Sequence, residues 1–379
     1  MDLSRDSPPR WGGQATESQR EGTGGRDCGR TGRLRASANQ PASDESVTSV
    51  TIAGGVSGSP GSRACCLLAP SVLGNRVIEA GDVTTHVYGN GGLTEGKERW
   101  GIVYTCGAGF IDVAHMRDMI DLTKFYHTTL LTKNKAGDKF NVFAGAKDNG
   151  EVVLKKAIAT PADQTAVAMS IAYDQSIWHE IVSYWECEQG MHPSSFSPED
   201  LVSNKFGVYV GGKIVLASDF NKQAVVEMTK LLATLGAVKS ADTRAAFTAI
   251  EGTWVDHSRG RLGALRFDYM RRRNFTYNPV APWILPTFAP CTGSTASVPA
   301  DFTYALDTNA RTFYTLTFTV PANARSGNPK LPTGRGDCFA STGTTTMTAT
   351  SVPTTDYDNQ ISIIKAQALI QYGAGFDSP

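Results

Sequence analysis

The chain has 379 residues, with 36 Lys and Arg against 36 Asp and Glu, so its formal net charge at pH 7 is zero. This balance gives no general reason to expect nucleic acid or an anionic membrane as a partner, and no apolar run is long enough to cross a bilayer. The seven cysteines are odd in number, too few for a disulfide scaffold and without a Cys-x-x-Cys spacing, which argues against a structural zinc site.

Residues 1–60 are rich in Gly, Ser, Arg, Asp and Pro and have no periodic apolar pattern, which predicts a disordered N-terminal arm. No secretory signal is visible in them. We expect order from near Cys65 onward. Residues 100–105 predict a buried strand, the glycines around Cys106 bend the chain, and Asp112 is placed to cap a helix that runs to about Leu131.

Residues 139–143 and 151–155 flank the turn signal at 148–150 and predict a hairpin. Thr160–Asp163 is a capping box that opens the longest predicted helix, from Pro161 to about Glu188. Further helices are expected from the capping box at 197–200, over 221–235 and over 241–251. We expect Gly211 and Gly212 to break or bend the first of these.

From 275 onward the composition changes to Pro, Thr and aromatic residues. Residues 314–320 alternate as in a half-buried antiparallel strand, and a short helix is expected over 361–371. Cys291 and Cys338 could form a disulfide in an oxidising compartment. The expected fold is α+β: a helix-rich core domain with a few short strands over 61–274, and a strand- and loop-rich C-terminal region over 275–379 packed on it.

The dyad His179-Glu180 lies in the middle of the long predicted helix, which is otherwise built from Ala, Met, Ile, Tyr and Trp. His179 shares a face with small residues that would let another element come close. His115 lies in the first turn of the preceding helix, where the helix dipole lowers the proton affinity of an imidazole. We therefore expect the two imidazoles to converge on one polar hollow, although an ordinary helix contact with a satisfied histidine has the same pattern.

Several stretches together resemble the exported bacterial family catalogued as domain of unknown function 4056. The matching stretches are Arg63–Cys66, Val103–Asp118 with Asp121, Ile171–Tyr173 leading to Trp178–Ile181, Ser195–Asn204, Gly252–Asp256 and Arg272–Asn274. The resemblance implies export to the periplasm or cell surface, but brings no established chemistry. The chain departs from the family in lacking a visible export signal, and in the Gly211-Gly212 pair, which interrupts a segment that is continuous helix in the family.

Three hypotheses follow for the chemistry. In the first, Cys106, after a buried strand and before a helix N-terminus, is a nucleophile, with a histidine from a separate element as base and an Asp or Glu orienting that histidine. In the second, His115, His179 and a carboxylate bind a divalent metal. In the third, Arg117 pairs with Asp121 and His115 with Glu180 in a buried network, and the protein has a binding or structural role in the cell envelope.

The concentration of polar groups at the starts and small-residue faces of two helices favours a hydrolase or acyl-transfer enzyme of the cell envelope. The residues expected in catalysis are His179, Glu180, His115, Cys106 and Asp112. Those expected to bind substrate are Arg117, Asp121, Trp178, Arg272 and Arg273. No cofactor is expected, apart from the metal of the second hypothesis, and the partner would be a small molecule or an envelope component.

Overall fold

The computed structural model describes Pro60, Arg63 and residues 76–90, 98–143, 149–185, 195–262, 265–320 and 351–379. These residues belong to one compact unit that extends from Ser49 to Pro379. Its helices and strands form an α+β fold, as the sequence predicts. The predicted arm before Pro60 and the cysteines at 65, 66, 187 and 338 lie outside the described residues.

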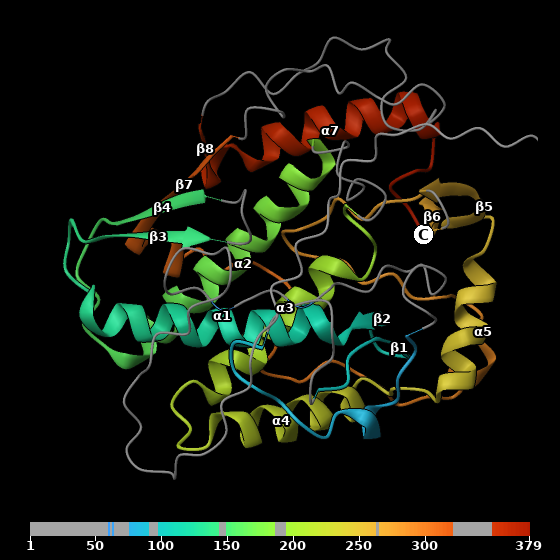
Figure 1. The fold of residues 1–379 in the computed structure, drawn as a ribbon, viewed down its shortest axis with the longest axis horizontal. Helices are drawn as coiled ribbons and strands as arrows, with labels where there is room; N and C mark the ends of the chain where they lie inside the picture. Colours follow the sequence, from blue (N-terminus) through green and yellow to red (C-terminus); the bar gives the residue numbers. More distant parts are fainter. Residues whose placement is uncertain are drawn as a thin grey trace, which may run out of the picture. The chain divides into compact units, whose positions relative to one another are not determined.

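Three helices, α1 (Val113–Thr132), α2 (Pro161–Trp185) and α3 (Asp200–Ile214), pack against one another at the centre of the unit (Figure 1). The predicted caps of the first two are confirmed. The Asp112 side chain accepts a hydrogen bond from the Ala114 amide at 2.7 Å, and the Thr160 hydroxyl accepts one from the Asp163 amide at 3.0 Å. Each cap satisfies an amide that the helix itself leaves unpaired.

The expectation that Gly211 and Gly212 break a helix is wrong, because α3 continues through both. A β-carbon on Gly211 would lie 2.8 Å from the Cβ of Thr123 on α1, and one on Gly212 would lie 2.3 Å from the sulfur of Met169 on α2. The glycines therefore let α3 approach both neighbours closely. This tertiary packing overrides the low helix propensity of glycine.

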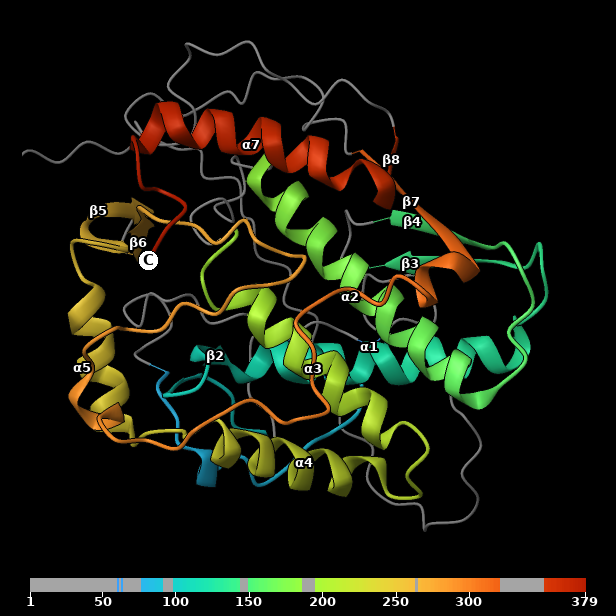
Figure 2. The same ribbon diagram turned by 180° about the vertical axis from the view of Figure 1, so that it is seen from behind.

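The larger sheet has the order β3-β4-β7-β8, with all neighbours antiparallel. The predicted hairpin is confirmed as β3 (Lys139–Phe143) and β4 (Asn149–Leu154), and the predicted strand near the C-terminus as β7 (Tyr314–Thr319). β8 (Ser351–Pro353) follows β7 in the sheet, and α7 (Tyr357–Tyr372) packs against α2 (Figure 2). Strands from distant parts of the sequence thus share one sheet. Its inner face is buried and includes Val152, Leu316 and Phe318.

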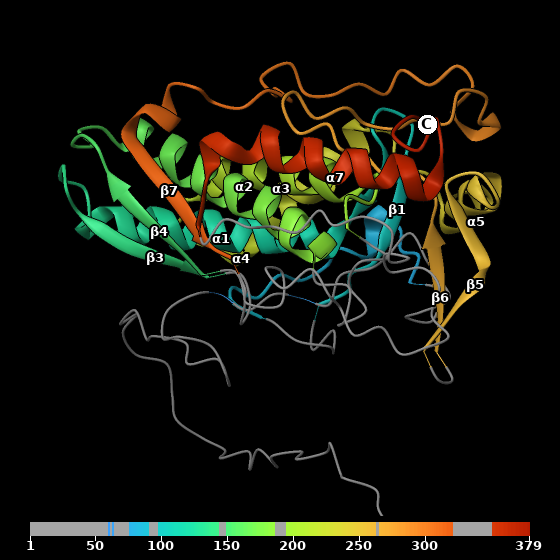
Figure 3. The same cartoon turned by 90° about the horizontal axis from the view of Figure 1, so that it is seen from above.

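Two smaller hairpins complete the strands of the described residues (Figure 3). β1 (Ile102–Thr105) pairs with β2 (Gly109–Asp112), which leads directly into α1, and β5 (Val255–Leu262) pairs with β6 (Leu265–Met270). Sequence analysis predicted neither β2 nor the second hairpin. The helices α4 (Phe220–Thr234) and α5 (Ser240–Ile250) lie close to their predicted bounds.

The short 3-10 helices are η1 (Ala80–Asp82), η4 (Ala289–Cys291), η5 (Ala310–Phe313) and η6 (Thr354–Asp356). Among the described residues, none of the helices combines the length and the apolar character needed to cross a bilayer.

Candidate functional site

The structure brings together side chains from the starts of α1 and α3 and the last third of α2. His115, in the first turn of α1, has its Nδ1 atom 3.5 Å from an Asp112 carboxyl oxygen and 3.3 Å from an Asp200 carboxyl oxygen. Burial and the nearby His179 lower the pKa of His115 to about 3. His115 is therefore neutral at pH 7, as expected, but burial and the second imidazole are the causes, not the helix dipole alone.

Glu180 follows His179 in α2 and is 2 % exposed. Its carboxyl accepts a hydrogen bond from the Phe196 amide at 2.6 Å and also bonds to Asp200, while its backbone carbonyl accepts from the Ser195 hydroxyl at 2.7 Å. Burial raises the pKa of Glu180, and His179 opposes this effect. Phe196 has a φ angle of 55°, a left-handed conformation that is strained for an aromatic residue and is held in place beside this carboxyl.

Two further carboxyl groups, missed as site residues by the sequence analysis, belong to the same cluster. Burial raises the pKa of Glu199 to about 8, and burial together with Glu180 and Glu199 raises that of Asp200 well above its ordinary value. One carboxyl oxygen of Glu199 is buried without a hydrogen-bond partner, whereas the other accepts from the Ser197 hydroxyl. In the sequence, Ser197–Asp200 has the pattern of a capping box. This pattern accounted for both acids, so they were not predicted as site residues.

Only half of that predicted capping box forms. The Asp200 carboxyl accepts from the Ser197 amide at 3.1 Å, but the Ser197 hydroxyl turns to Glu199. The helix consequently begins at Asp200, later than predicted, and its first acidic residue faces His115. In the sequence, two adjacent acids at the start of a helix look like ordinary capping acids, so they gave no separate signal of the site.

The cluster is rich in carboxyl groups and poor in cations. Among the described residues, no Lys or Arg forms an ion pair with Glu180, Glu199 or Asp200. The buried Arg273 acts to lower the pKa of Glu180, but its guanidinium bonds to the Ser195 carbonyl and, at 3.2 Å, to the Tyr372 hydroxyl. Buried carboxyls without a counter-charge stay protonated well above pH 5, and groups with such displaced pKa values are concentrated at functional sites.

The residues that the structure describes include no group of three or more His, Cys, Asp or Glu side chains arranged to hold a metal ion. The second hypothesis, a metal on His115, His179 and a carboxylate, therefore gains no support from the geometry. The cluster instead places buried carboxyls with raised pKa values beside the neutral imidazole of His115, whose Nδ1 atom is buried and accepts no hydrogen bond within the described structure.

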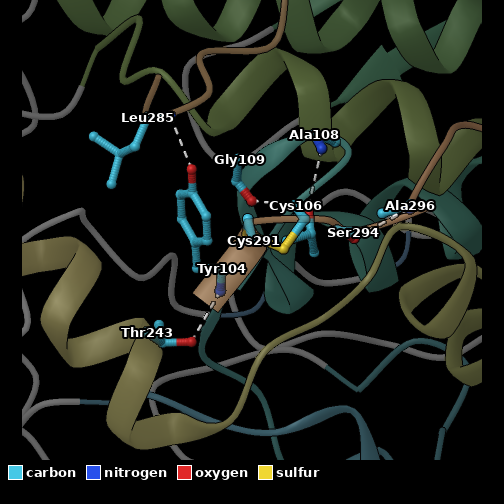
Figure 4. The surroundings of a disulfide bond; sticks show 10 residues. Tyr104, Cys106, Ala108, Gly109, Thr243, Leu285, Cys291, Ser294 and Ala296 are labelled. Atoms are coloured by element: carbon cyan, nitrogen blue, oxygen red, sulfur yellow. Dashed lines mark hydrogen bonds between the residues drawn. A yellow bond between two sulfur atoms is a disulfide. The ribbon is translucent and has the colours of Figure 1, made fainter. Parts of the chain in front are cut away.

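Cys106 is not available as a nucleophile, which corrects the first hypothesis. Its sulfur is bonded to that of Cys291, so the expected pairing of Cys291 with Cys338 is also wrong (Figure 4). The Cys106 amide donates to the Gly236 carbonyl at 3.1 Å, and the disulfide joins the β1–β2 turn to η4. Sequence separation concealed this pairing, because the two cysteines are 185 positions apart in the chain.

Arg117 and Asp121 belong to a separate buried cluster, which we call the Arg63 network. Its members are Arg63, His86, Glu98, Arg117, Asp118 and Asp121. The Arg63 guanidinium forms two bonds to Glu98, at 2.7 and 2.9 Å, and single bonds to Asp118 and Asp121. Arg117 donates to Glu98 and to two backbone carbonyls.

The Arg63 network is a structural ion cluster. Burial acts to lower the pKa of His86, but its bonds to Asp121 and Glu98 raise it above the ordinary value, which favours the charged ring. With His86 protonated, three cations face three carboxyl groups, and burial raises the pKa of one of these, Asp118, to about 7. Arg117 and Asp121 are thus engaged by protein groups, and their predicted role in substrate binding is not supported.

Two other predicted binding residues also lie away from the site. Trp178 is fully buried and stacks on Phe318 of β7, with ring centroids 5.0 Å apart. It fills the core between α2 and the sheet. Arg272 donates to the carbonyl of Ser378 at 3.1 Å. Of the predicted substrate-binding set, only Arg273 lies close enough to influence a site residue.

The fold and the cluster define an α+β protein with a buried site of carboxyl and imidazole groups between three helices. A family model described as protein of unknown function (DUF4056) matches residues 64–275, more than half of the chain, and the chain belongs to this family. The matched residues include the whole cluster from Asp112 to Arg273. No curated protein and no solved structure was found to be similar to the chain.

Proposed function

We propose that the protein is a hydrolase or acyl-transfer enzyme that works by acid–base catalysis at His115, His179, Glu180, Glu199 and Asp200. One observation supports this most directly: three buried carboxyls with raised pKa values lie beside two imidazoles, and among the described residues no Lys or Arg forms an ion pair with any of the three. Such an arrangement costs folding free energy, and selection retains it where chemistry needs it.

The exposure of the side chains supports one side of the site as the side from which a substrate would approach. His115 and His179 are the partly exposed members, whereas Glu180, Glu199 and Asp200 are at most 3 % exposed. A substrate would meet the imidazoles first, with the carboxyls behind them. The carboxyls would orient the rings and exchange protons with them, as carboxyl groups do in other acid–base sites.

In this mechanism the His179–Glu180 pair removes a proton from the attacking water or alcohol. Glu199, still protonated at pH 7, supplies a proton through the cluster to the leaving group. One bond to the acyl carbon forms as the other breaks. One proton enters the cluster and one leaves it, so the enzyme returns to its starting state.

The test is a panel of chromogenic esters, amides and anilides. We expect turnover of at least one of them, a loss of about 100-fold or more in His179→Asn, and a decline of activity above about pH 8 as Glu199 ionises. His127→Asn, which changes a buried histidine further along α1, is the matched control and should stay active. Equal activity of the two variants, or no turnover of any substrate, would count against the proposal.

A cell-envelope location is part of the proposal. The disulfide between Cys106 and Cys291 supports it, because disulfides persist in oxidising compartments and are rare in the cytosol. Alkylation of cells with a membrane-permeant maleimide before lysis, followed by mass analysis, tests it. Both cysteines should be protected unless the protein is first reduced, and labelled cysteines would contradict export.

A non-catalytic binding or structural role in the envelope is the second candidate, and the Arg63 network favours it, since its buried charged groups bond to one another. The two candidates differ in the effect of Glu180→Gln. A structural role requires a loss of a few kcal/mol of stability with this variant, whereas a catalytic role requires loss of turnover with the fold kept.

A further inference from the structure

A pocket separate from the carboxyl–imidazole cluster lies between α2, α3 and the segment 301–307. Its volume is about 140 Å³. Most of its wall is apolar or aromatic, from residues such as Met169, Val208, Phe302 and Leu306, and one amine, that of Lys205, lies among them. A cavity of about this size in a protein core accommodates one small aromatic molecule such as benzene.

Lys205 is unusual for a lysine in being only 9 % exposed. Its Nζ atom donates to the Ala305 carbonyl at 2.7 Å and lies 4.8 Å from the centre of the Tyr173 ring, so the amine has a defined position at the pocket wall. Burial lowers the pKa of Lys205 to about 8, although Asp174 and Asp307 oppose the effect. About a tenth of the amine is therefore unprotonated and nucleophilic at pH 7.

The acids around the pocket are mostly engaged by other groups. Asp174 accepts from Arg311 at 2.8 Å and from the Tyr314 hydroxyl at 2.7 Å. Asp301 accepts from the Tyr209 hydroxyl at 2.6 Å and pairs with Lys213 at 3.0 Å. Since these pairs balance their own charges, the pocket has no excess positive charge to attract an anion, and it favours a neutral ligand.

We propose that this pocket binds a small, mainly apolar aldehyde or ketone, and that Nζ of Lys205 forms an imine with the ligand's carbonyl carbon. The nitrogen lone pair adds to the carbonyl carbon, and the carbonyl oxygen takes up a proton to give a carbinolamine. Loss of the hydroxyl as water, with the second proton of the nitrogen, leaves the C=N bond. The neutral amine and the carbonyl compound thus give an imine and one water, with no change in oxidation state.

The experiment is reductive trapping on the full-length protein. Benzaldehyde with sodium cyanoborohydride, at pH 7.5, converts an imine into a stable benzylamine that intact-mass and peptide-mass measurements locate. We expect one benzyl group per chain, at Lys205, forming about ten-fold faster or more than at any other lysine, since the unprotonated fraction is larger there. Lys205→Arg should lose this label. Lys213→Arg, a more exposed lysine two turns along the same helix, should keep it.

A second variant separates pocket binding from reactivity of the amine alone. Ala166→Leu keeps Lys205 but fills part of the pocket, so trapping of benzaldehyde should fall by about ten-fold while trapping of formaldehyde persists. Melting curves establish that each variant is folded. Labelling spread over surface lysines at similar rates, or benzaldehyde trapping unchanged by Ala166→Leu, would overturn the proposal.

Discussion

Replacing Glu199 by Gln should stabilise the protein at alkaline pH. The carboxyl is fully buried, and its pKa is raised from an ordinary 4.5 to about 8 by burial first, with Asp112 and Glu180 adding to the effect. Below pH 4.5 the group is protonated in both the folded and unfolded states and contributes no pH dependence. Between pH 4.5 and 8 only the unfolded state releases the proton, so stability falls as pH rises.

The size of the effect follows from the two pKa values. The folded and unfolded pKa values of Glu199 differ by about 3.5, and each pKa unit corresponds to 1.36 kcal/mol. The ionisation of Glu199 therefore lowers the free energy of unfolding by at most about 5 kcal/mol, and this loss is reached above pH 8. The amide of Gln carries no charge and can still accept from the Ser197 hydroxyl. The variant should therefore match the wild type near pH 4.5 and exceed it in stability by about 2–5 kcal/mol at pH 9.

Urea unfolding at pH 5, 7 and 9 measures this difference directly, because the midpoint and slope together give the free energy of unfolding. Glu251→Gln is the matched control, since Glu251 is exposed at the end of α5, and its pH profile should run parallel to that of the wild type. A Glu199→Gln profile that also runs parallel to the wild type would show that Glu199 is ionised normally, and the carboxyl-rich site would lose its main support.

Three other changes test the framework around the site. Arg63→Met leaves three carboxylates of the Arg63 network without their main partner and should cost about 3–5 kcal/mol in urea unfolding. Gly211→Ala should destabilise by about 1–3 kcal/mol despite alanine's higher helix propensity, because the new methyl group meets Thr123 on α1; a gain in stability would refute this packing. The double change Cys106→Ala with Cys291→Ala should cost about 2–5 kcal/mol, read from melting under non-reducing conditions, with reduced wild type as the comparison.

Local signals in the sequence predicted many elements correctly. Thr160–Asp163 and Asp112 define helix starts through side chains that bond amides two or three residues away, so a short window contains all the information needed. The alternation over 314–320 identified β7 for the same reason. The glycines of α3 were misjudged, because what decides their role is the closeness of α1 and α2, which a local window does not contain.

The candidate site shows the same contrast between residues that stand out in the sequence and residues that only the structure identifies. The His179-Glu180 dyad and His115 stand out in the sequence, since charged groups in an apolar helix and at a helix start are visible without a fold. Glu199 and Asp200 do not, because a buried acid and a capping acid look alike until the surrounding side chains are placed. The same is true of Lys205, whose amine is unusual only through the burial that α2 and the segment 301–307 impose on it.

The sequence by itself determined the α+β class and the main helices and drew attention to both histidines of the candidate site, because periodicity and caps act over a few residues. Only the tertiary structure decided the partner of Cys106, the separation of the Arg63 network from the site, and the protonation of the buried carboxyls. Each of these depends on distances between residues far apart in the chain, and electrostatic and covalent interactions follow those distances, not the order of the residues.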